Sequence, residues 1–167
     1  MRQLIMLLLL AGLAAGCSAT APTKTIIIPP RFDRAYDEYH YAPAVRVGDT
    51  VIVSGIPAGP GDGYDERIRA MFKRLKMTLE AAGATLDDVV EITTFHRETK
   101  DTPAFEAEFQ RFLAIHKEYF QTGYPAWTAV GTTALLAEGA PVEMRAVAVV
   151  GAGKHLVVLR AKPPAAK

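Results

Sequence analysis

The amino-acid sequence predicts one α+β domain in which two helices cover one face of a mixed β-sheet. Its 167 residues suit a single compact domain, and a hydrophobic share of 50% is too high for intrinsic disorder. Apolar residues recur with the period of a helix in two segments and with the period of a strand in several others. The resulting order, β-β-α-β-α-β-β, contains too few helices to bury both faces of the sheet.

A β-hairpin is predicted at residues 45–55. Its arms are rich in β-branched residues, and Gly48 with Asp49 supplies the tight turn between them. Ahead of it, residues 17–35 contain several prolines and predict a tether, with one short edge strand at Ile26–Ile28. Further strands are predicted at residues 88–96, 126–131, 142–150 and 155–159.

Two amphipathic helices are predicted between these strands. In residues 65–82 the apolar side chains follow a 3.6-residue period, with acidic residues in the first turn and Gly83 at the end. The second helix is expected to start at Thr102 as its cap, followed by Pro103, whose missing N–H is harmless in the first turn. Its expected inner face consists of Phe105, Phe109, Phe112, Leu113 and His116.

Residues 1–16 have the features of an export signal. The apolar stretch Leu4–Ala15 is shorter than the roughly 20 residues that a membrane-spanning helix needs, and small residues follow its leucine-rich core. We therefore expect the folded domain to occupy residues 36–160 of an exported chain, with residues 161–167 as a disordered tail.

Cys17, the single cysteine, directly follows this signal and gives it the appearance of a bacterial lipobox. The departure from that motif is Ala14, where leucine is preferred. Acylation of Cys17 would anchor the protein at the periplasmic face of the bacterial envelope, and Ser18 favours the outer membrane. The alternative is an ordinary secretion signal with an unmodified Cys17.

Composition excludes several function classes. The chain has 19 Lys and Arg against 18 Asp and Glu, which argues against a nucleic-acid partner and against ribonuclease activity. A single cysteine excludes an intrachain disulfide and a cysteine-cluster zinc site. The four histidines are scattered, and the glycine-rich segment 59–63 lacks the lysine of a phosphate-binding loop. We expect no metal and no cofactor.

The strand at 142–150 carries two charged residues in an apolar setting. Glu143 and Arg145 share one face with Val147 and Val149, where a charge is unfavourable unless it is paired or faces a cleft. A mutual salt bridge, a solvated edge strand and a cleft are all compatible with this pattern. Strands that are apolar on both sides indicate that the sheet packs against another subunit.

Four segments together resemble the RidA/YjgF family of enamine/imine deaminases, once called L-PSP endoribonucleases. They are Tyr41–Gly55, with its Val-Gly-Asp-Thr-Val-Ile-Val-Ser-Gly sequence, Leu79–Val90, Tyr124–Val130 and Pro141–Met144. The resemblance covers about residues 36–150. It implies a chorismate-mutase-like fold and a homotrimer in which three sheets form an inner barrel, with a small-molecule cleft at each subunit interface.

The resemblance also implies the site residues. Glu143 would orient or activate the attacking water and Ser54 would assist it, while Tyr41, Gly55 and Ala129 would line the substrate pocket. These assignments rest on the matched segments alone.

The carboxylate-clamping arginine of the family does not match. Where the family has Pro-x-Arg, this chain has Pro125-Ala126-Trp127, and an indole carries one donor and no charge. Losing such a clamp weakens binding of a desolvated anion by about 2–5 kcal/mol, or roughly 30- to 4,000-fold. We therefore expect poor activity on 2-imino acids. Trp127 would either form the floor of a cleft for an apolar ligand or pack in the trimer interface.

The positive charge of the missing arginine could be supplied instead by Arg145, Arg97 or His40.

Two functions follow from these observations. The first is an envelope hydrolase or deaminase of an imine or a related small C–N compound. The second is a non-catalytic trimeric lipoprotein that binds a small molecule.

Overall fold

The computed structural model describes residues 21–97 and 99–162. The expected export signal and Cys17 lie outside these residues. The strands are β1 (Lys24–Ile27), β2 (Ala44–Val47), β3 (Thr50–Pro57), β4 (Val89–His96), β5 (Ala126–Gly131) and β6 (Val142–Val149). The helices are α1 (Asp33–Asp37), α2 (Tyr64–Ala81) and α3 (Thr102–Tyr119), with short 3-10 helices at η1 (Leu86–Asp88) and η2 (Ala152–His155).

The strands form one six-stranded mixed sheet in the order β1-β2-β3-β6-β4-β5. Only the β4–β5 pair is parallel, and every other neighbouring pair is antiparallel. The predicted hairpin is confirmed as β2 and β3, with Gly48 at the turn in the left-handed region, φ 59°. The predicted short edge strand is also present as β1, and it pairs with β2.

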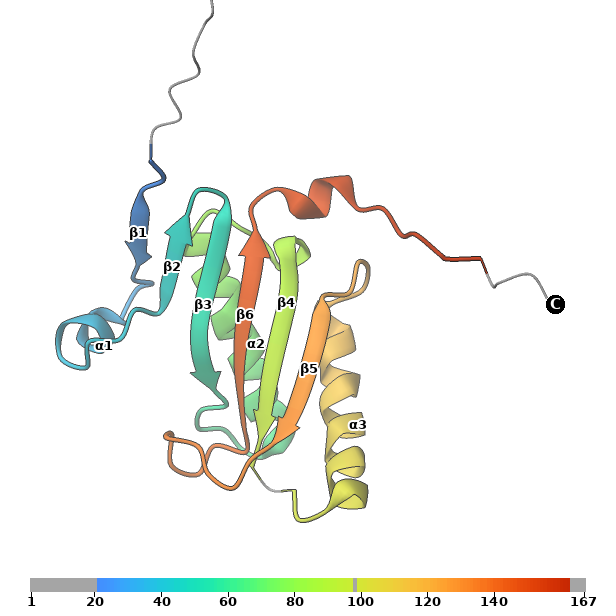
Figure 1. Cartoon of the computed structure of the whole chain (residues 1–167). Helices are drawn as coiled ribbons and strands as arrows, with labels where there is room; N and C mark the ends of the chain where they lie inside the picture. The colour runs from blue at the N-terminus through green and yellow to red at the C-terminus, as the bar shows by residue number, and fades with distance from the viewer. Residues whose placement is uncertain (1–20, 98, 163–167) are drawn as a thin grey trace, which may run out of the picture.

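Both long helices pack behind one face of the sheet, as Figure 1 shows. The α+β class with two helices on one face is thereby confirmed. The core between the two layers is largely apolar, with Phe72 of α2 beside Phe112 of α3 at 5.6 Å between ring centroids. Fully buried side chains of the sheet complete it: Val51, Val53, Ile92, Val142, Met144 and Ala148.

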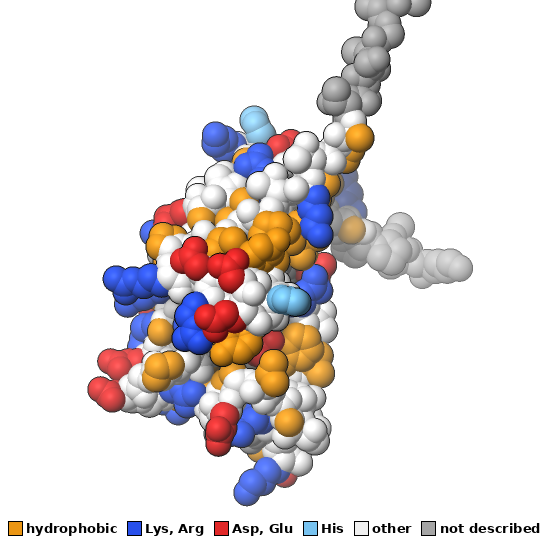
Figure 2. Space-filling view, turned by 90° about the vertical axis from the view of Figure 1, so that its left-hand side faces the viewer, with side chains coloured by type: hydrophobic (Ala, Val, Ile, Leu, Met, Phe, Trp, Pro, Cys, Tyr) orange, Lys and Arg blue, Asp and Glu red, His pale blue; other side chains and the backbone are white. Residues whose placement is uncertain are grey.

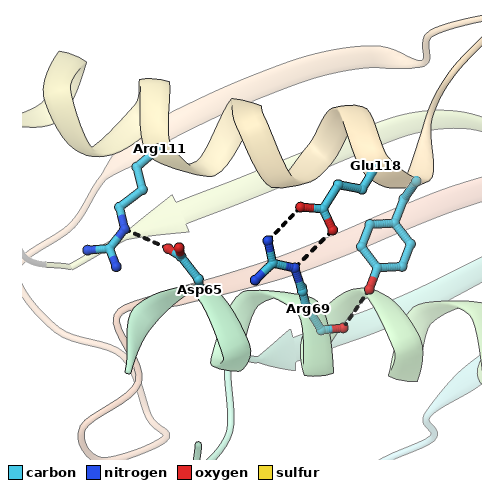
Figure 3. Close-up of polar contacts among 5 residues, drawn as sticks. Asp65, Arg69, Arg111 and Glu118 are labelled. Carbon is cyan, nitrogen blue, oxygen red and sulfur yellow. Dashed lines mark hydrogen bonds and ion pairs between the residues drawn. The ribbon is translucent and has the colours of Figure 1, made fainter. Parts of the chain in front are cut away.

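Ion pairs join α2 and α3 on the outer surface (Figure 3). Arg69 donates to both oxygens of Glu118 at 2.9 and 2.6 Å, and Arg111 donates to Asp65 at 2.6 Å. The Tyr119 hydroxyl donates to the Arg69 carbonyl oxygen at 3.2 Å. These contacts fix the two helices side by side but are solvent-exposed, so apolar burial makes the larger contribution to stability.

Three local predictions are corrected. The cap of α3 is Asp101, because its carboxylate accepts from the Ala104 N–H of the first turn at 2.9 Å while Thr102 already has helical geometry. Residues 155–159 form no strand, since Gly151 reverses the chain with φ 84° and starts η2, which directs the following residues away from the sheet. The short helix α1 was not predicted.

The sheet face opposite the helices carries side chains with unequal exposure. In β6, alternate residues starting at Val142 are buried against the helices, whereas Glu143, Arg145, Val147 and Val149 are partly exposed on the other face. Ile52 of β3 lies level with Val147 and is 44% exposed. No helix in the described part of the chain is long and apolar enough to cross a bilayer.

Candidate functional site

A cavity of about 490 Å³ lies at the end of β3, next to the point where β2 begins. The pairing of β3 with β6 is irregular between Val53 and Ile56, which places Gly55 at a kink beside Glu143. The segment around α1 forms the outer wall and α2 forms the back wall. The lining is mostly apolar or aromatic: Phe32, Ala35, Tyr39, Tyr41, Pro43, Gly55, Ile56, Pro57, Arg74, Thr78, Leu136, Ala137 and Glu143. On this edge of the molecule, beside β1 and α1, hydrophobic side chains gather with charged residues around them (Figure 2).

Glu143 extends from β6 over the backbone of Gly55. A Cβ at position 55 would overlap the Glu143 carboxylate, so the glycine leaves the space that this carboxylate occupies. Partial burial raises the pKa of Glu143, because desolvation disfavours the ionised form. Among the residues that the structure describes, no side chain forms a hydrogen bond or ion pair with this carboxylate. It is therefore available to a ligand or a water molecule in the cavity.

Tyr41 lies on the same cavity and its hydroxyl donates to the Gly55 carbonyl oxygen at 2.6 Å. Burial raises the pKa of the Tyr41 phenol and Glu143 raises it further, while Ser54 and Arg74 lower it. Ser54 does not line the cavity. Its hydroxyl donates to the Ala42 carbonyl oxygen at 2.7 Å, which fixes the segment that carries Tyr41, and its catalytic role stays a prediction.

Arg74 of α2 brings a positive charge into this cavity and was not singled out from the sequence. Its guanidinium carbon lies 5.4 Å from the centre of the Phe32 ring, a cation–π distance. In the sequence Arg74 follows Lys73 on a basic helix, which has the pattern of a solvated helix face. The contact with Phe32 arises only in the fold, so no local pattern in the sequence marks Arg74 as a site residue.

Trp127 and Ala129 lie on β5, at the edge of the sheet opposite to β1, so one chain does not bring them into the cavity with Glu143. Trp127 faces the helices. Its ring stacks on His116 with 4.6 Å between centroids, and its Nε1 donates to the Thr94 hydroxyl at 3.0 Å. Ala129 borders a shallow apolar groove with Phe105 and Phe109 of α3.

Trp127 is also the first member of a buried hydrogen-bond network between β4 and α3. His96 is fully buried, with Nε2 2.8 Å from the Thr94 hydroxyl and Nδ1 2.6 Å from Glu108. Tyr64 donates to the other oxygen of Glu108. Burial raises the pKa of Glu108 to about 7 and lowers the pKa of His96 to about 4, so between these values the pair holds one proton and no net charge.

The cations considered from the sequence lie elsewhere. Arg145 on β6 pairs with Glu91 at 3.7 Å, and His40 is exposed at a left-handed position with φ 53°. Neither they nor Arg97 line the cavity. Within the described ranges there is also no cluster of three or more His, Cys, Asp or Glu side chains that could hold a metal ion.

Comparisons with known proteins show which family the chain resembles. The model of the family described as "Endoribonuclease L-PSP" matches residues 33–150, more than half of the chain. The chain is 34% identical over 116 residues to the RutC family protein YjgH of Escherichia coli K12, covering 66% of this chain and 84% of that protein. It is 32% identical over 120 residues to a 2-iminobutanoate/2-iminopropanoate deaminase of Dermatophagoides farinae, covering 66% and 85%.

Solved structures show the same fold. The structure of protein YjgH superposes with a TM-score of 0.65 at 32% identity, covering 76% of this chain and 96% of that one. Rv2704 of Mycobacterium tuberculosis, described as a member of the YjgF/YER057c/UK114 family, superposes with a TM-score of 0.66 at 29% identity, covering 77% and 100%.

Proposed function

The chain belongs to the endoribonuclease L-PSP family, which contains the RidA/YjgF proteins, and from this premise we propose that it hydrolyses the C=N bond of an imine or a related small compound. The observation that carries the proposal is the unpaired Glu143 carboxylate in a largely apolar cavity, beside the Tyr41 hydroxyl. The name of the mite relative, a deaminase of two imino acids, supports the reaction class.

The reaction requires one water molecule and no redox partner. Water attacks the imine carbon while Glu143 accepts a proton from it and passes that proton to the nitrogen, which gives a neutral carbinolamine. The carbinolamine hydroxyl then loses its proton to the same nitrogen as the C–N bond breaks, which releases ammonia and leaves a carbonyl. Burial raises the pKa of the Glu143 carboxyl, which makes its carboxylate a stronger base than an exposed one. Tyr41 would accept a hydrogen bond from the imine N–H or from the attacking water, since its own proton is donated to the Gly55 carbonyl oxygen.

Poor turnover of the smallest 2-imino acids belongs to this proposal. Trp127 stands where related deaminases are expected to hold the substrate carboxylate with arginine, and its Nε1 is already engaged by Thr94. A three- or four-carbon imino acid would lose a charge-assisted clamp and would fill little of the 490 Å³ cavity.

The test is release of ammonia from imines generated in situ by an amino-acid oxidase. Glu143→Gln should lower kcat by about 10²- to 10⁴-fold, the usual contribution of a general base. Glu138→Gln removes the same charge from an exposed position five residues earlier and should leave the rate unchanged. A rate that is equal in the wild type, the Glu143 variant and buffer alone would exclude the proposed reaction.

A non-catalytic binding protein is the alternative, and the apolar lining of the cavity favours it. In that case a ligand would bind and be recovered unchanged, and Glu143→Gln would alter affinity without any turnover to lose. Equilibrium dialysis followed by quantitation of the recovered ligand separates the two functions.

The proposal includes assembly into a homotrimer through the open face of the sheet. Val147, Val149 and Ile52 leave apolar surface on this face, which a second and third copy would cover. Val147→Lys should convert the assembly into monomers in sedimentation experiments, whereas Lys73→Gln on the helix side should not. A wild-type protein that sediments as a monomer would contradict the trimer.

The proposed location is the periplasmic face of the bacterial envelope, through acylation of Cys17. Metabolic labelling with a radioactive fatty acid should mark the wild-type protein and not Cys17→Ser. Unlabelled wild-type protein in the culture fluid or periplasm would indicate simple secretion instead.

A further inference from the structure

Arg74 is the feature of the cavity that the proposed reaction does not use. Catalysis at an imine needs a base and an orienting group, and Glu143 with Tyr41 supplies both. A guanidinium on the same cavity wall has no part in that step. Its presence calls for a ligand group that a positive charge would hold.

The guanidinium is held in place without being neutralised. Among the described residues it forms no ion pair with an acidic side chain, in contrast to Arg34, Arg69, Arg111 and Arg145, which all do. Its fixed contact is the face of Phe32, which orients the planar group and leaves its N–H donors free. Arg74 also acts on Tyr41, since its charge lowers the pKa of the Tyr41 phenol.

The rest of the cavity lining indicates the chemistry of the remainder of the ligand, beyond its anionic group. Apolar and aromatic side chains make up most of the cavity wall, contributed by α1 and its flanks, by β3 and by the loop before β6. The cavity volume of about 490 Å³ lies within the range of pockets that enclose small organic ligands. A ligand with a bulky apolar body would therefore fill space that a three-carbon acid leaves to water.

We infer that Arg74 binds the carboxylate of the ligand and that the preferred ligand is an organic acid with a bulky apolar or aromatic side chain. As a statement about substrate, this rests on the proposed imine hydrolysis; as a statement about binding, it does not. A planar guanidinium can hold a carboxylate through two parallel hydrogen bonds. The site thereby regains from α2 the anion recognition that Trp127 cannot supply from β5.

The binding experiment uses phenylpyruvate, its methyl ester and pyruvate as probes, with affinity measured by titration calorimetry. Wild-type protein should bind phenylpyruvate more tightly than pyruvate and more tightly than the ester. Arg74→Gln should weaken phenylpyruvate binding by about 30-fold or more and leave the ester unchanged. Arg74→Lys should recover part of the loss, because it keeps the charge without the planar fork.

Lys73→Gln is the matched control, since it removes one positive charge from the adjacent, exposed position of α2 and should not change binding. Thermal melts verify that each variant is folded. Equal phenylpyruvate affinity in the wild type and Arg74→Gln, or no binding of phenylpyruvate to the wild type, would overturn the inference.

Kinetics distinguish this inference from the proposed reaction. With imines generated from phenylalanine and alanine, Arg74→Gln should raise KM for the aromatic imine and leave kcat nearly unchanged, whereas Glu143→Gln should lower kcat. Arg74-dependent binding without any turnover would exclude the reaction and support carboxylate binding by Arg74. Turnover that is unaffected by Arg74→Gln in both KM and kcat would support the reaction and overturn carboxylate binding by Arg74.

Discussion

Two regions of the molecule hold their polar groups in different ways. At the cavity, Glu143 of β6 and Arg74 of α2 form no ion pair with any described side chain. At the β5 edge, Trp127 and Thr94 are joined by a hydrogen bond, and His96 continues the chain to Glu108. Partly buried charges without partners are unfavourable for stability and are typical of binding sites, whereas a satisfied buried network is typical of structural packing.

The tryptophan that replaces the family's arginine at position 127 affects packing at β5 and leaves ligand recognition to other residues. An indole on β5 is well accommodated within the chain because His116, Phe109 and Phe112 surround it. The same substitution removes a cation from β5, while Arg74 of α2 supplies one at the cavity. Stability should therefore respond to changes at the β5 edge, and ligand binding to changes at the cavity.

The largest expected effect is on stability, from Trp127→Ala. Removing the indole leaves a void beside three aromatic rings and deprives Thr94 of a donor, so we expect a loss of about 3 kcal/mol in the free energy of unfolding. Urea unfolding measures it. Tyr124→Ala, which removes an aromatic ring that is 74% exposed just before β5, should change stability little. Equal losses in the two variants would contradict a packing role for Trp127.

At the cavity edge, Gly55→Ala should affect activity and not stability. The new methyl group displaces the end of the Glu143 side chain, which is flexible, and the backbone of Gly55 does not have a positive φ. We expect imine hydrolysis to fall by about 10- to 100-fold while the free energy of unfolding changes by less than about 1 kcal/mol. Gly59→Ala, which meets Arg74 at an ordinary 3.6 Å, is the control. A fully active Gly55→Ala protein would argue against a role for Glu143.

Much of the sheet could be predicted because its signals are local. Gly48 and Asp49 specify the turn of the β2–β3 hairpin, and the 3.6-residue period specifies α2 independently of its partners. The strand expected at 155–159 shows the limit of such signals. Its apolar residues suit a strand, but Gly151 directs the chain away from the sheet before they can pair.

The candidate site was only partly predictable for a related reason. Glu143 was assigned through the matched Pro141–Met144 segment, and its charge in an apolar strand is a second signal that lies within the strand itself. Arg74 gives no such signal, since it becomes distinctive only when the α1 segment brings Phe32 against it. Ser54 matched the family segment, yet its hydroxyl is directed to the Ala42 carbonyl oxygen by a backbone arrangement that spacing cannot reveal.

The β5 edge should also make the protein sensitive to acid. Burial lowers the pKa of His116 to about 4, below the 6.5 of an unfolded histidine, so the unfolded state binds more protons between these pH values. Stability should then fall by about 2 kcal/mol as the pH decreases from 6.5 to 4. His116→Phe should reduce this decrease, and His155→Gln, at an exposed position, should not. Urea unfolding at several pH values measures the slope, and identical slopes in all three proteins would contradict the assignment.

The smallest effect should come from Thr94→Val, which keeps the side-chain shape and removes only the hydroxyl. Trp127 Nε1 and His96 Nε2 would both lose their partner inside a buried layer, and we expect a loss of about 1–2 kcal/mol in the free energy of unfolding. Thr94→Ser retains the hydroxyl and should preserve most of the stability. Because Trp127 is the only tryptophan, its fluorescence should shift in Thr94→Val and not in Thr94→Ser. Imine hydrolysis should be the same in both variants, because Thr94 pairs with Met144 on the buried, helix-facing side of the sheet whereas Glu143 lies on the opposite face, and reduced turnover in Thr94→Val would mean that the two faces are coupled.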